Sequence, residues 1–301
     1  TIGRTNQIRN ERIANVIRTE GVLEILVADY SFLRASVTDF SSEAAKYNAS
    51  VFTHRISATT AQDYSQANGY VATATTQTDL QITLNKFKHV SYSVDDQERT
   101  SSNINLIERF AGAAAHALGL QMVGDLLALV TSSTFTSALT VASSAFSYRS
   151  VVSAGITLNN SNVPVNGRYA VLNPSFYGAL LNDTTVVANP QITGDLVRTA
   201  GIGNVAGFNI NQYSAVPGNS ITLGGFFAQQ EALLIATRVP EVPTGVPIPG
   251  EISVVTEPRT GLSVQVRENY DVVKGMLQRT YALIYGVKAG EPASLVRING
   301  S

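Results

Sequence analysis

The sequence contains no cysteine, which excludes disulfides, thiolate zinc sites, iron–sulfur clusters and cysteine nucleophiles. It contains only three histidines, His54, His89 and His116, and no two of them are close enough in the chain to form a metal-binding pair of the H-x-x-x-H kind. No G-x-S-x-G elbow and no Walker loop occur. Stability must therefore come from packing or from assembly with other chains.

Charge is scarce as well, because only 14% of the residues are charged and the formal net charge is −1. The chain as a whole thus carries no strong electrostatic signature for nucleic acid or for an anionic membrane, and any such contact must be local. The 301 residues, 44% of them hydrophobic, suffice for one large domain or two moderate ones. No apolar signal segment opens the chain, and Thr1 indicates either removal of the initiator Met or cleavage of a longer N-terminus.

The longest helical pattern runs from about Ser102 to Val130, and we expect a spine helix there. Ser101 or Ser102 can cap its start, where nearby acidic residues complement the helix dipole. One apolar stripe consists of Ile104, Ile107, Ala111, Ala114, Leu118, Met122, Leu126 and Leu129. A second stripe consists of Leu120, Val123, Leu127 and Val130. Two stripes predict a helix that other parts of the chain cover on more than one side.

Two other interpretations of this segment are weaker. Five polar or charged residues interrupt the stretch that a membrane-spanning helix would need: Glu108, Arg109, His116, Gln121 and Asp125. A coiled coil would need a sustained heptad with charged flanks, which the spacing does not supply. We expect His116 to be a core or interface histidine rather than a catalytic base.

Residues 1–30 form the most basic stretch and read as an amphipathic helix or arm that needs a partner surface. Its arginines are Arg4, Arg9, Arg12 and Arg18. These side chains either form a solvated helix face or contact a polyanion or a neighbouring subunit.

Residues 50–79 are polar and too poor in large apolar groups to build a core, with Gly69 and Tyr70 near the centre. A coreless loop of this length is usually functional or disordered. We expect it to contact an adjacent subunit, with Gly69 and Tyr70 among the interface residues. Strict alternation then predicts two strands, one around Leu80–Leu84 and one around Val90–Val94, which lead into the spine helix.

All ten prolines lie after residue 163, which indicates a second, turn-rich unit that follows a Ser/Thr-rich linker at 132–145. We expect helices at Tyr148–Leu158 and Pro174–Leu181. The expected strands are Arg168–Leu172, Val205–Tyr213, Ile221–Leu223, Leu233–Val239, a hairpin of Ile252–Thr256 with Leu262–Val266, and a last strand at Tyr281–Val287. The C-terminal strands need a buried face, which the spine helix offers.

One glycine pattern, Gly201-Ile-Gly203-Asn-Val-Ala206, matches the dinucleotide fingerprint letter for letter. That fingerprint must follow a buried strand and open a helix, whereas here a strand-like segment follows. Tight turns between strands explain the glycines better. The carboxylates at Asp95, Asp96 and Glu98 fit a helix start better than acid–base catalysis.

Two segments carry a family resemblance. Residues 168–183, a strand followed by Asn173-Pro174 and a helix, and residues 197–210, containing the G-x-G-x-V-A-G-F run, resemble the axial-domain core of tailed-bacteriophage major capsid proteins. Further matching positions are Gly224-Gly225-Phe226, the stretch Ala232–Pro240, and Tyr281 and Tyr285. The resemblance covers about residues 80 to 288.

The resemblance implies the α+β fold of the Hong Kong phage type, with four parts. These would be an N-terminal arm at 1–49, an extended β-loop at 50–90, a peripheral domain with the spine helix at 91–133 and 250–301, and an inserted axial α/β domain at 134–249. Some relatives cross-link through a lysine in the extended loop. Here Lys86 and Lys88 sit at its base, so we expect no cross-link.

The function so implied is a structural protein of the virion, not an enzyme, that self-assembles in the host cytoplasm into hexamers and pentamers of an icosahedral shell. The implied partners are other copies of the chain, packaged double-stranded DNA, and portal, scaffolding and decoration proteins, with no membrane, cofactor or metal. One alternative is an encapsulin-type compartment that encloses protein cargo. Another is an enzyme that binds a nucleotide at the Gly201 loop.

Overall fold

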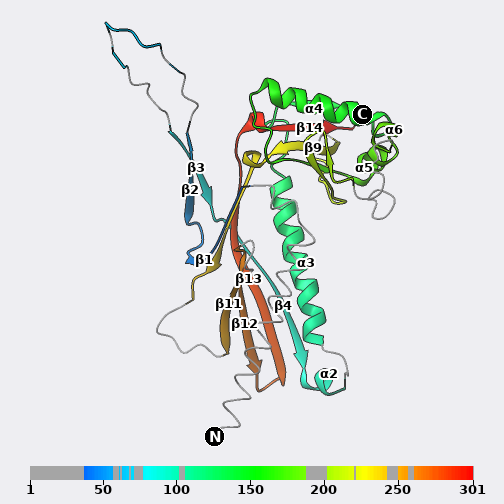
Figure 1. Cartoon of the computed structure of the whole chain (residues 1–301). Coiled ribbons are helices and arrows are strands. Elements are labelled where there is room, and N and C mark those ends of the chain that lie inside the picture. Colours follow the sequence, from blue (N-terminus) through cyan, green and yellow to red (C-terminus); the bar gives the residue numbers. More distant parts are fainter. Residues whose placement is uncertain are drawn as a thin grey trace.

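The computed structural model describes residues 37–56, 61, 63–67, 69–70, 77–101, 106–187, 202–219, 222–242, 250–256 and 261–300. These residues form an α+β fold with an elongated body, and a two-stranded extension projects from that body (Figure 1). The arginines at 4, 9, 12 and 18 lie outside the described residues.

The lower part of the body in Figure 1 is a sheet with strand order β1-β10-β13-β12-β11, in which β4 also pairs with β13. Its strands are β1 (Val37–Ala45), β4 (Lys86–Asp95), β10 (Leu233–Pro240), β11 (Glu251–Thr256), β12 (Ser263–Asp271) and β13 (Met276–Ala289). The expected hairpin is confirmed, because β11 and β12 pair antiparallel from Thr256 opposite Ser263. β1 pairs parallel with β10, so a segment assigned to the arm is a strand of this sheet.

The spine is confirmed as a helix, α3 (Leu106–Leu127), which ends before the expected Val130. The short helix α2 (Asp96–Ser101) precedes it, and the expected helix positions 102–105, with Ile104 of the first stripe, lie outside the described residues. Asp95 caps α2, since its Oδ1 accepts a hydrogen bond from the Glu98 amide at 2.6 Å. Ser101 is the last residue of α2 rather than a cap. Beyond the end of α3, the Asn219 side chain donates to the carbonyls of Leu127 and Val130, at 3.0 and 2.7 Å, and so satisfies acceptors that the helix leaves unpaired.

One face of α3 is buried, as the first stripe predicted. The buried members of that stripe are Ala111, Ala114, Leu118, Met122 and Leu126, whereas Leu129 is half-buried. In the second stripe Val123, Leu127 and Val130 are buried. Leu120 is 44% exposed, so its expected burial was wrong. His116 is exposed on the isolated chain, so it is not a core histidine, and its expected place in an interface stays a prediction. The helix packs on the sheet with one side, and these two residues lie outside the covered sector.

The upper part of the body is a second sheet with the strand order β5-β14-β9-β6-β8-β7. Its strands are β5 (Ala138–Thr140), β6 (Arg168–Leu172), β7 (Asn204–Val205), β8 (Phe208–Gln212), β9 (Leu223–Gln229) and β14 (Leu295–Asn299). The helices around it are η2 (Ser143–Ala145), α4 (Tyr148–Asn160), α5 (Pro174–Leu181), α6 (Thr184–Val187), η3 (Gln230–Ala232) and η4 (Pro292–Ser294). The bounds of β6 and α5 agree with the sequence prediction, and Asn173 caps α5 by accepting from the Phe176 amide at 3.0 Å.

Several expectations about the second sheet need correction. The linker at 132–145 contains β5 and η2, and the strand expected at 205–213 is a hairpin of β7 and β8. The strand expected at Ile221–Leu223 begins only at Leu223. The sequence predicts Tyr281–Val287, within β13, as the last strand, but β14 follows it and joins the second sheet beside β9. β10, expected within the inserted unit, lies in the first sheet.

Both faces of the second sheet are buried, because its central strands send alternate side chains into two cores. From β9, Phe226 and Ala228 join the core around α3, whereas Phe227 joins the core under α4 and α5. Tyr169 and Val171 of β6 face the α3 core in the same way. The α3 core also contains Tyr281 and Leu283 of the first sheet. One continuous apolar core therefore joins the spine helix to both sheets.

Candidate subunit-contact surfaces

The extension consists of β2 (Ser50–Ile56) and β3 (Gln77–Thr83), which pair antiparallel from Ser50 opposite Thr83 to Ile56 opposite Gln77. Its root is anchored in the body, because Val51, Leu80 and Ile82 pack with residues of β10 and β13 in a small core. Beyond the root the extension leads away from the body (Figure 1). Phe52 on β2 is exposed. A long two-stranded ribbon leaves backbone groups and side chains open to a second chain.

The tip of the extension is a tight turn closed by a pairing of Ser65 with Gly69, whose amide donates to the Ser65 carbonyl at 2.8 Å. Gly69 has φ +65°, a left-handed conformation that favours glycine. The turn places Tyr64 and Tyr70 side by side, with ring centroids 4.9 Å apart. Their exposed fractions are 61% and 94%. The predicted site residues Gly69 and Tyr70 therefore lie together at the tip, and an exposed aromatic pair is typical of a contact surface.

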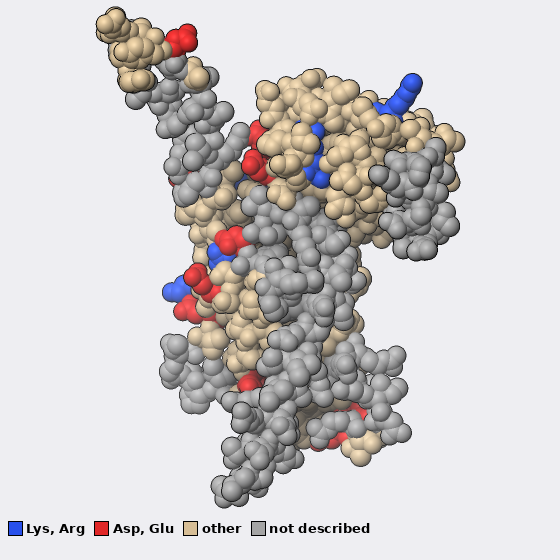
Figure 2. Space-filling view, in the orientation of Figure 1, with Lys and Arg blue, Asp and Glu red and all other residues tan. Residues whose placement is uncertain are grey.

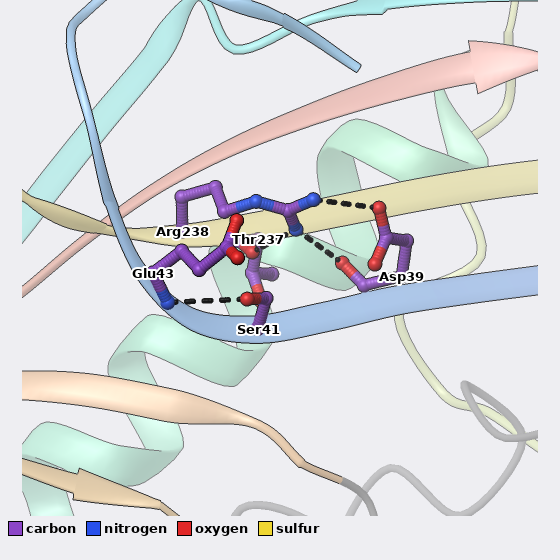
Figure 3. A network of polar contacts seen from close by, with 5 residues as sticks. All are labelled: Asp39, Ser41, Glu43, Thr237 and Arg238. Carbon is purple, nitrogen blue, oxygen red and sulfur yellow. Dashed lines mark hydrogen bonds and ion pairs between the residues drawn. The ribbon is translucent and has the colours of Figure 1, made fainter. Parts of the chain in front are cut away.

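The sequence analysis did not predict the connection between β1 and β10, which Figure 3 shows. The Arg238 guanidinium pairs with the Asp39 carboxylate at 2.8 Å and also donates to the Asp39 carbonyl at 3.1 Å. The parallel pairing shifts register between Phe40 and Ala44, and within that irregularity the Ser41 hydroxyl accepts from the Glu43 amide at 3.1 Å (Figure 3). These contacts attach β1 to the body, and β1 is the first described strand after the basic segment of the sequence.

The spine helix is fastened to the sheet by polar groups at its C-terminal end. Asp125 accepts a hydrogen bond from the Tyr285 hydroxyl at 2.6 Å and pairs with the Lys86 ammonium at 3.3 Å. Burial raises the pKa of Tyr285, and the hydrogen bond to Asp125 raises it further. The phenol therefore stays protonated and serves as the donor.

A charge pair between a buried arginine and a half-buried glutamate lies farther along the same sheet. Arg279 of β13 donates from Nε to a Glu268 carboxylate oxygen at 2.8 Å. Burial by itself would lower the pKa of Arg279, but the hydrogen bond and charge of Glu268 raise it, so the guanidinium stays charged. Tyr92 of β4 packs between this region and the helix, with its ring centroid 5.4 Å from that of Phe110. The Tyr92–Phe110 contact helps to position α3 on the sheet.

The described residues show no group of three or more metal-ligating side chains. In the glycine pattern, Ala206 and Gly207 have φ +50° and +85° and form the turn between β7 and β8. The pattern therefore lies in a hairpin and not at a strand-to-helix turn, which confirms the turn interpretation for the residues described there. Among the described residues, Phe110–Leu127 is a helix segment long and apolar enough to cross a membrane by length and composition, and half of it is buried inside the fold.

Charged side chains are sparse on the face shown in Figure 2, where the Lys and Arg side chains of the described residues are scattered. This distribution agrees with the low charge of the sequence. The most basic segment, with Arg4, Arg9, Arg12 and Arg18, lies outside the described residues.

Comparison with known proteins identifies the fold. No family model and no curated protein matches the sequence. Among solved structures, that of Mycobacterium phage Che8 is 19% identical and has a TM-score of 0.54, over 91% of this chain and 89% of that one. The capsid structure of the cyanophage P-SCSP1u is 10% identical with a TM-score of 0.61, over 89% of this chain and 86% of that one.

A third structure is a virus-like particle from Pyrococcus furiosus, 12% identical with a TM-score of 0.52, over 92% of this chain and 96% of that one. The likeness spans about nine tenths of the chain in each case. The chain thus has the α+β fold of phage capsid proteins, the Hong Kong phage type that residues 168–210 indicated.

Proposed function

We propose that this chain is the major shell protein of a tailed phage, assembling into the hexamers and pentamers of an icosahedral head that encloses double-stranded DNA. The observation that carries the proposal is the fold itself, which matches a phage capsid structure over nearly its whole length. The extension adds support, because its exposed tyrosine pair lies away from the body, where another subunit can cover it. The role is structural.

The division into four parts that the sequence predicts belongs to this proposal. In it, β1 and β10 are added to the peripheral domain, whose sheet is the first sheet, and β14 is added to the axial domain, whose sheet is the second. Arg4, Arg9, Arg12 and Arg18 are assigned to the inner surface, where they contact DNA or a neighbouring subunit. Gly69 and Tyr70 are assigned to a subunit interface. Assembly takes place in the host cytoplasm, with portal, scaffolding and decoration proteins as further partners.

The shell is also proposed to lack lysine cross-links. Lys86 is engaged in the ion pair with Asp125 and lies at the root of the extension. Boiling assembled particles in denaturant should release single 32.0 kDa chains. A ladder of covalent oligomers would contradict this part of the proposal.

The experiment that tests the main proposal is to purify the full chain and examine it by sedimentation and negative-stain microscopy. Uniform polyhedral particles are expected. Particles recovered from a lysate should contain nuclease-protected double-stranded DNA when the packaging proteins are present. A chain that stays monomeric under all assembly conditions would refute the proposal.

A second candidate is an encapsulin-type compartment, favoured by the likeness to the Pyrococcus furiosus particle. The contents of the particles distinguish the two. A compartment would hold a co-purified protein in defined stoichiometry and no protected DNA. An enzyme that binds a nucleotide is disfavoured by the β7–β8 hairpin, and saturable dinucleotide binding would be needed to revive it.

A further inference from the structure

Asparagine followed by glycine occurs three times in the sequence, at positions 68–69, 166–167 and 299–300. Asparagine is a thermolabile residue, and a following glycine leaves it least protected. Glycine has no Cβ to keep its amide nitrogen away from the carbonyl carbon of the preceding side chain. The first of the three asparagines lies outside the described residues. The structure describes the other two pairs in full and holds them in different ways.

The pair Asn299-Gly300 is held at both residues. The Oδ1 atom of Asn299 accepts a hydrogen bond from the Arg297 guanidinium at 3.2 Å. The Gly300 amide donates to the Thr222 carbonyl at 2.9 Å, and the Gly300 carbonyl accepts from the Thr222 hydroxyl at 2.7 Å. The Gly300 nitrogen can reach the Asn299 side chain only after these bonds open, so the fold protects this pair.

The pair Asn166-Gly167 lies in the loop between α4 and β6 and lacks these restraints. Both residues are exposed, and within the described part of the chain no hydrogen bond holds the Gly167 amide or the Asn166 side chain. Gly167 has φ +76°, and a Cβ built on it would lie 2.8 Å from the Gln230 side chain. The fold therefore requires glycine at the one position that makes Asn166 reactive.

The loop that carries this pair is closed at its base. Arg168, which is buried, donates to the Val163 carbonyl at 2.6 Å and to the Pro164 carbonyl at 3.0 Å. These bonds join the two ends of the loop and leave positions 166 and 167 at its apex. Backbone that is exposed and without hydrogen bonds changes conformation at little cost in free energy, so the apex can reach a reactive geometry while the loop stays folded.

We propose that Asn166 is a site of spontaneous deamidation in the folded protein, with water as the co-reactant. The Gly167 amide nitrogen attacks the side-chain carbonyl carbon of Asn166 and forms a cyclic imide. The bond from Cγ to Nδ2 breaks, and the side-chain nitrogen leaves as ammonia with the proton of the Gly167 amide. Water then opens the imide and leaves aspartate or isoaspartate at this position.

The reaction introduces a negative charge into a part of the chain that has none. No Asp or Glu occurs between Asp125 and Asp183, so the product is the first carboxylate of that stretch. The formal net charge of each reacted copy, −1 before the reaction, becomes more negative by one charge. The inference goes beyond the proposed function and does not depend on it, because the reaction takes place within a single subunit.

Peptide mapping tests the proposal, because trypsin separates the three Asn-Gly pairs into peptides 56–86, 150–168 and 298–301. The folded native chain is incubated in mildly alkaline buffer. Fragment masses, together with labelling by an isoaspartate-specific methyltransferase, then measure the reaction at each site. Modification should accumulate several-fold faster at Asn166 than at Asn299. A rate at Asn166 equal to or below that at Asn299 would overturn the inference.

Two controls separate the fold from the local sequence. In the urea-unfolded chain both sites should react at similar rates, because each asparagine precedes a glycine. A difference that persists unchanged in urea would overturn the structural explanation. N166Q should abolish the modification of peptide 150–168, and N299Q should leave it unchanged. Modification of that peptide at the native rate in N166Q would place the reaction at another asparagine and would overturn the assignment.

Discussion

The hydroxyl of Tyr285 donates a 2.6 Å hydrogen bond to the carboxylate of Asp125, which joins the central strand of the first sheet to the spine helix across 160 positions of sequence. The same carboxylate pairs with Lys86 of β4 at 3.3 Å. Asp125 therefore holds α3 against two strands at once. Without it, apolar packing and the hydrogen bonds from Asn219 would remain to fix the helix at this end.

Removing the Tyr285 hydroxyl should destabilise the subunit. We expect Y285F to lower the free energy of unfolding by about 1.5–3 kcal/mol, the usual net value of a hydrogen bond to a charged group. Y270F is the matched control, because Tyr270 also donates to a carboxylate, Asp96, but at an exposed position. Y270F should lower the free energy of unfolding by less than Y285F does. Urea unfolding of the subunits measures both, and an equal or greater loss for Y270F would contradict the role of burial.

Alanine substitutions in the spine helix should destabilise the subunit on its buried face and not on its exposed face. L118A and L126A remove buried side chains and should each cost about 2–5 kcal/mol of unfolding free energy. L120A alters a partly exposed leucine of the same helix and should stay within about 1 kcal/mol. Chemical denaturation distinguishes these cases. A loss for L120A as large as that for L118A would mean that the helix is covered on the second side as well.

Elements that depend on short-range signals could be predicted from the sequence. The β6–α5 unit was found because Asn173 and Pro174 give a helix start after an apolar run. The β11–β12 hairpin was found because Gly261 closes a short turn between two strands. The tip of the extension was singled out because Gly69 and Tyr70 interrupt a polar stretch.

Elements fixed by distant partners could not be predicted. β1 carries no distinct strand signal, and it is held by the pairing of Asp39 with Arg238, 199 positions away. β14 reads like any short apolar segment, and its place beside β9 and β5 is set by pairing across the chain. The exposure of Leu120 was missed because helix periodicity indicates which residues share a face, not whether another element covers that face.

Acid should weaken the packing of α4 and α6 through Asp183. Its carboxylate accepts from the Tyr148 amide at 2.6 Å and from the Thr185 amide at 2.8 Å, and these bonds hold the pKa of Asp183 below its usual range. A lowered folded-state pKa stabilises the fold above the unfolded-state pKa of about 3.9, and that contribution is lost as the pH falls through the folded-state value.

The variant D183N checks this expectation. It should be less stable than the native subunit at pH 7, and the difference should shrink when urea unfolding is repeated at pH values approaching 3. A difference that stays constant over this range would show that the charge of Asp183 contributes nothing.

Neutralising the basic segment should affect filled particles and not the subunit. The variant R4Q/R9Q/R12Q/R18Q should fold with an unchanged melting temperature, because the changes remove charge from a segment that we assign to an inner surface. Filled particles should be recovered in lower yield or should lose DNA at lower salt, because fewer cations neutralise phosphate. Filled particles equal to native ones in yield and salt stability would refute the assignment.

Shortening the extension should prevent assembly and leave the folding of the subunit intact. Its root belongs to the core through Val51, Leu80 and Ile82, so the cut must spare all of β2 and β3. We replace residues 57–76 by a short Gly/Ser turn, which retains the pairing from Ser50 opposite Thr83 to Ile56 opposite Gln77. As a milder companion, Y64S/Y70S keeps the length and removes only the aromatic pair.

The shortened subunit should melt close to the native temperature, because the contacts seen for the described residues of the tip are its own turn and an exposed ring contact. Particle yield measured by sedimentation should fall to near zero for the shortened chain and by several-fold for Y64S/Y70S, because each removes contact area that a neighbouring subunit would bury. Normal particles from the shortened chain would refute the intersubunit role. A misfolded shortened subunit, with Y64S/Y70S assembling normally, would instead show that the extension serves the fold of its own chain.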